Sequence, residues 1–196
     1  MVALLLFPFI AFSQSKSVSK IKFGINAGVN YANLSPDGLL PTNAELSNGV
    51  GFSLGILMDY SITGKLSISP KSEIAFFNSS IESVGAARPD LPYNVFSATV
   101  NLMTHLVYKM GNGNSGPYLL AGPNFKIPIS ERPELSSSFY TNSDFAIDFG
   151  IGLENSLPKF IFAPELRYSF GLGNVNQNPT LNPLNFHNVT LVLNFK

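Results

Sequence analysis

The sequence predicts an all-β fold, an eight-stranded antiparallel up-and-down transmembrane β-barrel, on three observations. Segments in which apolar and polar residues alternate occur eight times along the chain, which is the pattern of β-strands with one apolar face. Every charged residue inside these segments lies on their polar face. The connections between the segments alternate between short and long, as in barrels that insert into a membrane from one side.

Each of the first four predicted strands places alternate residues on an apolar face. These strands cover residues 22–31, 51–61, 65–77 and 95–109, and their apolar faces begin at Phe23, Phe52, Leu66 and Phe96. Ser72 interrupts the apolar face of the third strand. The alternation otherwise has the period of two that an extended chain requires, so four half-apolar strands are expected in this part of the chain.

The second half of the chain predicts four more strands of the same kind. They cover residues 118–129, 144–154, 159–171 and 189–195, and their apolar faces begin at Leu119, Phe145, Phe160 and Val189. The first of these is the least regular, because Pro123 stands on its apolar face. The strand over residues 144–154 alternates without exception.

The polar face separates a membrane barrel from a soluble one. Apart from Lys65 and Lys159, which are the first residues of their strands, eleven charged residues lie within the predicted strands, all on the polar face, and several glycines share that face, Gly150 and Gly152 among them. Glycine only weakens an exposed strand, but it fits a crowded barrel interior, where small residues must alternate with long paired ones. A membrane barrel with a polar lumen is therefore expected, with a soluble exported β-barrel binding protein as the alternative.

Aromatic residues and connection lengths support the same orientation of the faces. Aromatic side chains gather near both strand ends, as in the interfacial bands of membrane barrels: Phe23, Tyr60, Tyr108, Phe160 and Phe195 at one end, and Tyr31, Phe52, Phe76, Phe96, Phe145 and Phe170 at the other. Three connections are short (62–64, 110–116 and 155–158) and four are long (35–49, 78–94, 130–142 and 172–187). Long outer loops and short periplasmic turns place both chain ends in the periplasm of a diderm bacterium.

The N-terminal residues predict export. An apolar stretch runs from Val2 to Phe12, shorter than the roughly 20 residues of a membrane-spanning helix. The small residues Ala11 and Ser13 lie where a signal peptidase requires them, so cleavage is expected before Gln14. The domain prediction is thus a signal peptide over residues 1–13, a periplasmic segment over 14–20 and an outer-membrane β-barrel domain over 21–196.

Composition excludes several other functions. Charged residues make up only 12% of the 196 residues, about half the share of an ordinary soluble domain. The 12 basic and 12 acidic residues balance and form no basic cluster, which argues against a nucleic-acid partner. Because the chain has no cysteine, it can form no disulfide, thiolate metal site or cysteine-linked lipid anchor.

Five short stretches resemble the PorT-like outer-membrane β-barrel proteins in their order and spacing. They are FGINAGVNYANL (23–34), GFSLGILMDYSITGKLSISPKSEIAF (51–76), PYLLAGPNF (117–125), DFGIGLE (148–154) and APELRYSFGLGNV (163–175). The resemblance implies an eight-stranded barrel in the outer membrane, and some members of that family are linked to protein secretion to the cell surface. It implies no enzymatic activity, catalytic residues or cofactor.

A charge network is expected inside the lumen. If the strands over 144–154 and 159–171 form a hairpin that turns at 155–158, Glu165 is level with Asp148, and Arg167 lies between Asp148 and Asp144. The guanidinium group of Arg167 can bridge two carboxylates. The luminal charges within the predicted strands, five positive and six negative, nearly balance, so a filled polar core is expected rather than a selective pore.

Two of the long loops are candidate contact surfaces for partners. The loop over 78–94 contains Arg88 and Tyr93, and the loop over 130–142 contains Arg132 and Tyr140, with prolines nearby in both. Prolines restrict the free loop and so lower the entropy cost of binding, and Arg and Tyr are frequent anchors of interfaces. Apart from membrane lipid, the expected partners are outer-membrane or secretion-complex proteins bound through these loops.

A lipid-modifying enzyme is the alternative function. Only His105 and His187 can serve as a base near neutral pH, and His187 falls near Ser169 of the neighbouring strand. A single luminal histidine, however, is usually one member of a polar network. The chain has no spacing typical of a metalloprotease, nucleophile elbow, P-loop or calcium loop, so no catalytic, metal or cofactor site is expected.

Overall fold

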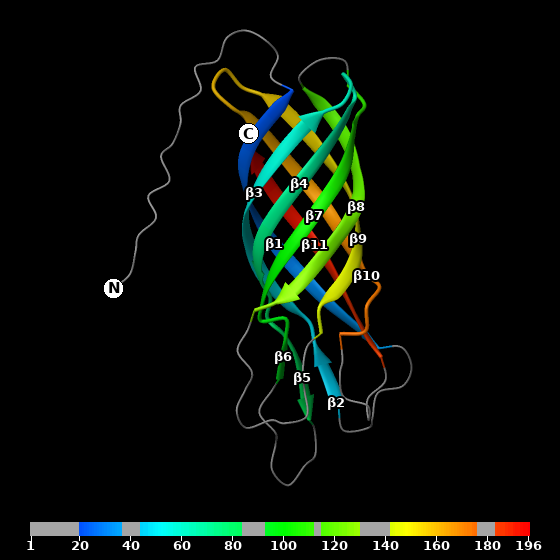
Figure 1. Cartoon of the computed structure of the whole chain (residues 1–196). Helices are drawn as coiled ribbons and strands as arrows, with labels where there is room; N and C mark the ends of the chain where they lie inside the picture. Colours follow the sequence, from blue (N-terminus) through cyan, green and yellow to red (C-terminus); the bar gives the residue numbers. More distant parts are fainter. Residues whose placement is uncertain (1–19, 37–43, 84–92, 112–114, 130–141, 176–182) are drawn as a thin grey trace, which may run out of the picture.

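Figure 1 shows a computed structural model of the chain, in which tilted strands form a tall barrel. The structure describes residues 20–36, 44–83, 93–111, 115–129, 142–175 and 183–196. The predicted signal peptide (1–13) and residues 14–19 of the predicted periplasmic segment lie outside these ranges. Over the described residues the regular elements are all β-strands. A search of the same residues finds no helix with the length and apolar character needed to span a bilayer.

Eight antiparallel strands close into the barrel, which confirms the predicted fold class. In order around the wall they are β1 (Ile21–Pro36), β11 (Leu184–Phe195), β10 (Ile161–Gly171), β9 (Asp144–Ser156), β8 (Gly116–Pro128), β7 (Ala98–Lys109), β4 (Leu66–Phe76) and β3 (Gly49–Ser61). Closure occurs where β1 pairs with β11, for example Val29 with Leu191. A closed barrel has no free sheet edge, which is the condition for a β-structure inside a bilayer.

The two faces of the wall have opposite polarity throughout. In β9, for example, Phe149 and Ile151 are more than half exposed, whereas Asp148 and Glu154 are buried. The same holds for β1, where Ile25 is exposed and Asn26 is buried. An apolar outside around a polar inside reverses the arrangement of a soluble protein, so this wall is suited to contact with lipid.

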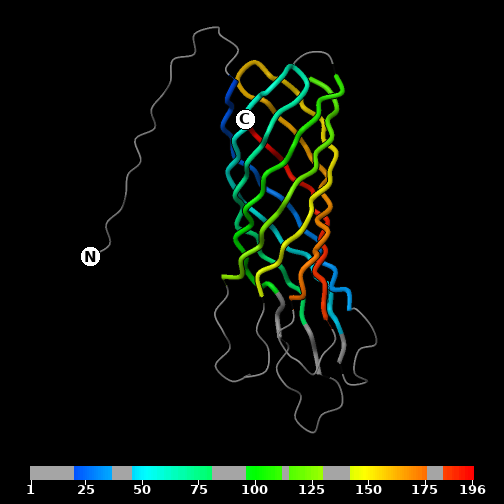
Figure 2. Tube along the Cα trace, turned by 45° about the vertical axis from the view of Figure 1, so that its right-hand side comes forward, coloured from blue at the N-terminus to red at the C-terminus, as the bar shows by residue number. Residues whose placement is uncertain are grey.

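The two ends of the barrel differ in their connections. Short turns join β3 to β4, β7 to β8 and β9 to β10 at one end, where β1 begins and β11 ends; this is called the turn end (upper end of Figures 1 and 2). The opposite end, called the loop end, carries the longer connections.

The loop end contains strands that the alternation pattern does not predict. β2 (Ala44–Ser47), β5 (Ser79–Ser83) and β6 (Tyr93–Val95) form a separate three-stranded antiparallel sheet, in the order β2-β5-β6, below the barrel in Figure 1. Residues 35–49 and 78–94, which were predicted as long loops, therefore contain strands. These strands have three to five residues each and pair only with one another, so they are too short to show a period of two.

Two barrel strands are also longer at the loop end than predicted. β1 continues to Pro36, and β11 begins at Leu184, five residues before the predicted start at Val189. The two extensions pair with each other, from Ala32 opposite Asn188 to Pro36 opposite Leu184. The extra pairing extends this part of the wall at the loop end, beyond the predicted strand ends.

Phe96 is misplaced in the prediction. It was expected to start the apolar face of the strand over 95–109 and to belong to the outer aromatic band, but it is fully buried and has a φ of 53°. This left-handed backbone conformation turns the chain between β6 and β7, so β7 begins at Ala98. The turn directs the Phe96 ring inward, where it packs edge-on against Phe186 with ring centroids 4.8 Å apart.

An apolar cluster, called the loop-end cluster, fills the barrel interior at the loop end. Its members are Ala32, Leu34, Ala75, Phe77, Phe96, Val175, Leu184 and Phe186. The Phe186 ring is central, because Phe77 also packs edge-on against it at 5.0 Å. Leu46 of β2 packs against the cluster from the small sheet. The loop end of the lumen is thus closed by apolar packing.

Candidate functional site

The polar lumen is the largest concentration of chemically active groups in the described part of the chain. Strand alternation turns six cationic side chains and six carboxylates inward, and each lies within 4 Å of an oppositely charged partner. The cations are Lys22, Lys71, Lys109, Lys126, Arg167 and Lys196; the carboxylates are Asp59, Glu73, Asp144, Asp148, Glu154 and Glu165. Charge balance of this kind is what a buried ionic core requires.

Arg167 of β10 lies at the centre of the network. Its Nη1 and Nη2 groups donate to the two carboxylate oxygens of Glu73 at 3.1 and 2.6 Å. Its Nη1 also lies 3.6 Å from Glu165, and its Nε lies 3.8 Å from Asp148. A planar guanidinium group can serve three carboxylates at once because its donors point along fixed, diverging directions.

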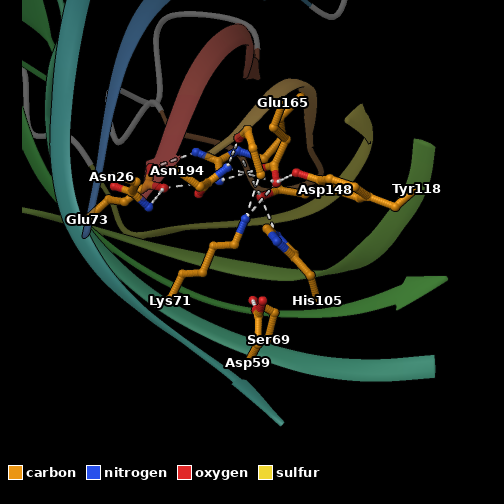
Figure 3. A network of polar contacts seen from close by, with 12 residues as sticks. Asn26, Asp59, Ser69, Lys71, Glu73, His105, Tyr118, Asp148, Glu165 and Asn194 are labelled. Atoms are coloured by element: carbon orange, nitrogen blue, oxygen red, sulfur yellow. Dashed lines mark hydrogen bonds and ion pairs between the residues drawn. The ribbon is translucent and has the colours of Figure 1, made fainter. Parts of the chain in front are cut away.

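Lys71 and Tyr118 complete the partners of Glu165. The Lys71 ammonium group donates to both oxygens of Glu165 at 2.9 Å, and the Tyr118 hydroxyl donates to one of them, also at 2.9 Å. Figure 3 shows these side chains converging on Glu165 from different parts of the wall. Buried side chains of β4, β8 and β10 therefore meet and occupy the lumen at this level.

His105 of β7 belongs to the same network. Its Nε2 lies 3.0 Å from the Asp148 carboxylate, which also accepts hydrogen bonds from the Asn124 amide at 3.1 and 3.2 Å. His105 and Asp148 are fully buried, and Figure 3 shows the two side chains pointing toward each other. His105 therefore anchors a carboxylate in the lumen and is not placed against a hydroxyl nucleophile in the described hydrogen bonds.

Asp144 and Lys126 form a separate ion pair next to the loop-end cluster. Lys126 lies 3.6 Å from Asp144 and donates to the Asn188 side chain at 2.9 Å. The Lys126 ammonium group also lies 4.8 Å from the centroid of the Phe186 ring. This cation–π contact joins the polar network to the apolar cluster.

Lysines paired with carboxylates line the turn end of the lumen. Lys109 and Lys22 lie 2.5 and 3.8 Å from the carboxylate of Glu154. Lys196 lies 2.5 Å from Asp59, which also accepts a hydrogen bond from the Ser69 hydroxyl at 2.6 Å. The Lys22 and Lys109 side chains are 27% and 18% exposed, so the Glu154 pairs are less dry than the Arg167 cluster, whereas the Lys196 and Asp59 side chains are only 7% and 9% exposed.

Comparison with known proteins places the chain in a family. A family model described as "Outer membrane protein beta-barrel domain" matches residues 12–177, most of the sequence. The chain belongs to this family. The protein is accordingly located in the outer membrane, and its fold is that of an integral outer-membrane β-barrel protein.

Solved structures with the same fold support this assignment. Neisserial surface protein A (15% identity, TM-score 0.54) covers 90% of this chain and 98% of its own. OprG from Pseudomonas aeruginosa (14%, 0.52) covers 88% and 93%, and AlkL, determined by solid-state NMR in DMPC bilayers (17%, 0.51), covers 94% and 92%. At these identities the likeness concerns the fold alone. No curated protein matches the sequence significantly.

The predicted alignment of β9 and β10 in this outer-membrane barrel is wrong. Glu165 pairs with Gly152 and Arg167 with Gly150, and Ser169 stands opposite Asp148. The reason is the position of the turn, because β9 continues to Ser156 and the backbone closes from Leu157 to Phe160. Moving the turn centre by two residues shifts the pairing by four.

The members of the predicted network are consequently divided. Arg167 contacts Asp148 and Glu165, but Asp144 pairs with Lys126 instead. The principal partner of Arg167, Glu73, was not predicted. Alternation identified Glu73 as luminal, but β4 and β10 are not adjacent strands, so no hairpin register relates them. Lys196 was also missed, although alternation from Asn194 places it on the inward face.

His187, the second candidate histidine, lies on the lipid-facing side of the wall. His187 stacks on the Phe170 ring at 4.8 Å and on the Tyr168 ring at 6.2 Å, and both rings are exposed to the lipid side. Ser169 is buried on the luminal face. The predicted proximity of Ser169 and His187 is therefore wrong, because neighbouring positions on paired strands point to opposite faces.

Most of the predicted loop contacts lie outside the described residues. This applies to Arg88, Arg132 and Tyr140. Tyr93 is the first residue of β6, one of the two edge strands of the small sheet at the loop end. These four positions stay predictions about recognition by the loops.

Two further observations concern ligands. Over the described ranges, no three His, Asp or Glu side chains are grouped so that they could hold a metal ion. A hollow of about 770 Å³ lies against strands β7 to β11 and is lined largely by outward side chains, such as Leu106, Phe149 and Tyr168. Because these side chains face the acyl chains of the membrane, the hollow belongs to the lipid boundary and not to the lumen.

Proposed function

We propose that this protein is a non-enzymatic outer-membrane barrel whose lumen is a structural core and whose loop end makes the functional contacts. The observation that carries the proposal is the filled lumen, in which each cation and carboxylate has a partner and the loop-end cluster closes one mouth. A barrel filled in this way favours neither conduction nor catalysis. The segments at the loop end, outside the barrel wall, then carry the function, which is recognition of partners.

The loop end offers two features suited to recognition. The small sheet of β2, β5 and β6 is attached to the barrel through the loop-end cluster, which gives the loops a firm base. The predicted contact residues Arg88, Tyr93, Arg132 and Tyr140 belong to the connections at this end. The expected partners are proteins of the outer membrane or of a secretion complex, in line with the resemblance to PorT-like proteins.

The proposal includes the route to the membrane. Export through a signal peptide over residues 1–13, cleaved before Gln14, would deliver the chain to the periplasm. Insertion then places the turn end in the periplasm and the loop end at the cell surface. N-terminal sequencing of protein from purified outer membranes tests the cleavage, and protease digestion of intact cells tests the orientation.

Loop deletions test the function itself. Removal of residues 83–92 or 132–140 is expected to leave the barrel folded, shown by unchanged heat-modifiable mobility in gels, and to abolish crosslinking from a photoreactive group at position 93 to a partner. The matched control carries the photoreactive group at Leu157 of the turn end, which lies at the opposite mouth. Deletions that leave every cellular phenotype unchanged would contradict the proposal.

The enzyme alternative makes a separate prediction. His105→Ala is expected to leave the composition of outer-membrane lipids unchanged, because His105 contacts a luminal carboxylate. His187→Ala is expected to do the same, because His187 is part of an aromatic stack on the outer wall. If either substitution eliminates a lipid-modifying activity in a strain with normal barrel levels, the enzyme function replaces the recognition function.

A further inference from the structure

The lysines at the turn end fall into two groups with different partners. The inner group consists of Lys22, Lys109 and Lys196, which turn toward the lumen and pair with Glu154 and Asp59. The outer group consists of Lys20, Lys65 and Lys159, whose side chains are exposed. Among the residues that the structure describes, no carboxylate pairs with an outer lysine.

The outer lysines are distributed around the rim. Lys65 lies in the turn from β3 to β4, and Lys159 lies in the turn from β9 to β10. Lys20 immediately precedes β1, and its carbonyl oxygen accepts a hydrogen bond from the Ser61 amide at 2.8 Å, which places it beside the Lys65 turn. The rim therefore presents two neighbouring lysines, at the start of β1 and in the β3–β4 turn, and a separate one in the β9–β10 turn.

Each short turn also exposes an apolar side chain. Ile62, Met110 and Leu157 are each 47% exposed, one in each turn region. Below them lies the aromatic band of Phe23, Tyr60, Tyr108, Phe160 and Phe195, all of them exposed on the outer wall. Exposed apolar side chains beyond an aromatic band suit the boundary between acyl chains and headgroups better than open water.

We propose that Lys20, Lys65 and Lys159 form a binding surface for the phosphate groups of anionic phospholipids in the leaflet around the turn end. A lysine extends its apolar stem along the wall and its ammonium group to the headgroup level. The neighbouring apolar tips hold the turns at that level. Phosphate groups then supply the anionic partners that the luminal carboxylates supply to the inner lysines.

The distribution of acidic residues favours this occupant. The four predicted long connections contain six acidic and two basic residues, so the attraction for anionic headgroups is confined to the turn end. An acidic protein partner would not explain why an exposed apolar residue accompanies each turn. The surface is independent of the loop contacts proposed above and adds a second, lipid-specific interaction.

Lipid selectivity in reconstituted vesicles tests the proposal. The protein is placed in phosphatidylcholine vesicles with a trace of spin-labelled phosphatidylglycerol or phosphatidylcholine, and electron spin resonance gives their relative association. One lysine near a membrane surface corresponds to about fivefold in affinity for an anionic headgroup at its site. The triple variant Lys20→Gln/Lys65→Gln/Lys159→Gln is expected to lose the preference for phosphatidylglycerol, and the triple Lys→Arg variant is expected to retain it.

A neighbouring pair of lysines provides the matched control. The Lys109 amide donates to the Lys65 carbonyl at 2.8 Å, so the two residues are adjacent, but only Lys109 turns to a carboxylate in the lumen. Lys65→Gln should lower the preference, and Lys109→Gln should not. Equal effects of the two, or a triple Gln variant that keeps its lipid preference, would overturn the proposal. So would a triple variant that binds lipid normally but loses an acidic periplasmic protein.

Discussion

At the loop end of the lumen, the rings of Phe77 and Phe96 pack against Phe186, whereas at the turn end lysines pair with Glu154 and Asp59. The loop end excludes water through apolar contact, which does not depend on salt. The turn end relies on charges near solvent, which salt screens. The comparison indicates that the loop end is the firmer mouth, as expected if it supports the recognition loops.

The Arg167 cluster lies between the two mouths and is buried more completely than the turn-end pairs. Its guanidinium group serves Glu73, Glu165 and Asp148, and the side chain is 3% exposed. In contrast, the Lys22 and Lys109 side chains are 27% and 18% exposed. The contribution of an ion pair should therefore fall from the centre of the lumen to the turn end.

The largest effect is expected from Arg167→Ala. It leaves three carboxylates near one another with a single remaining ammonium partner, so the free energy of unfolding should fall by about 3–5 kcal/mol. Urea unfolding in phospholipid vesicles measures the loss. Arg167→Lys is the control and should recover only part of it, because lysine lacks the planar donors that bind Glu73. An unchanged urea midpoint for Arg167→Ala would show that the network does not stabilise the barrel.

Phe186→Ala should be next in size. It removes the central ring of the loop-end cluster and the ring beneath Lys126, for a loss of about 3 kcal/mol in the free energy of unfolding. The loss should be the same at low and high salt. Phe145→Ala is the matched control, because Phe145 faces the lipid, where acyl chains can occupy the space. A larger effect at Phe145 would contradict the importance of the loop-end seal.

Gly152 lies near the turn end, and Gly152→Ala should lower the free energy of unfolding by a smaller amount. A methyl group at this position would overlap the Tyr118 ring, which donates its hydroxyl to Glu165. Overpacking of this kind costs about 1–3 kcal/mol. The double variant Gly152→Ala/Tyr118→Phe separates the two causes. It lacks the hydrogen bond from Tyr118 to Glu165 but keeps the overlap between the added methyl group and the aromatic ring. If Gly152→Ala unfolds at the wild-type urea concentration, the lumen has more room than the structure indicates.

The smallest effect is expected from Lys22→Gln. It removes the more distant of the two ammonium partners of Glu154, and the Lys22 side chain is 27% exposed, so the loss in the free energy of unfolding should be below about 1 kcal/mol and should shrink as salt is added. Lys159→Gln is the control at the same end, and in phosphatidylcholine vesicles, which offer no anionic headgroup, it should not change the urea midpoint because Lys159 is exposed. A loss that is independent of salt would place Lys22 in a drier site than the comparison assumes.

The sequence alone was sufficient to predict the strands of the barrel wall and the face on which each side chain lies. The alternation of Phe149 and Ile151 with Asp148 and Gly150 marks one face for lipid and the other for the lumen, because successive side chains of a strand point in opposite directions. Once the faces are known, the charges on the polar face must be interior. The eight strands, their antiparallel order and the luminal position of Arg167 follow from local pattern and connection length.

Only the tertiary structure decided which charges meet. Arg167 reaches Glu73, and Lys71 reaches Glu165, across the lumen between strands that are not neighbours. Barrel closure and strand tilt set these pairings, and neither leaves a trace in hairpin spacing. The inward turn of Phe96 and the small sheet at the loop end depend in the same way on packing against distant residues. Alternation thus assigns each side chain to a face, and the closed three-dimensional wall selects its partner.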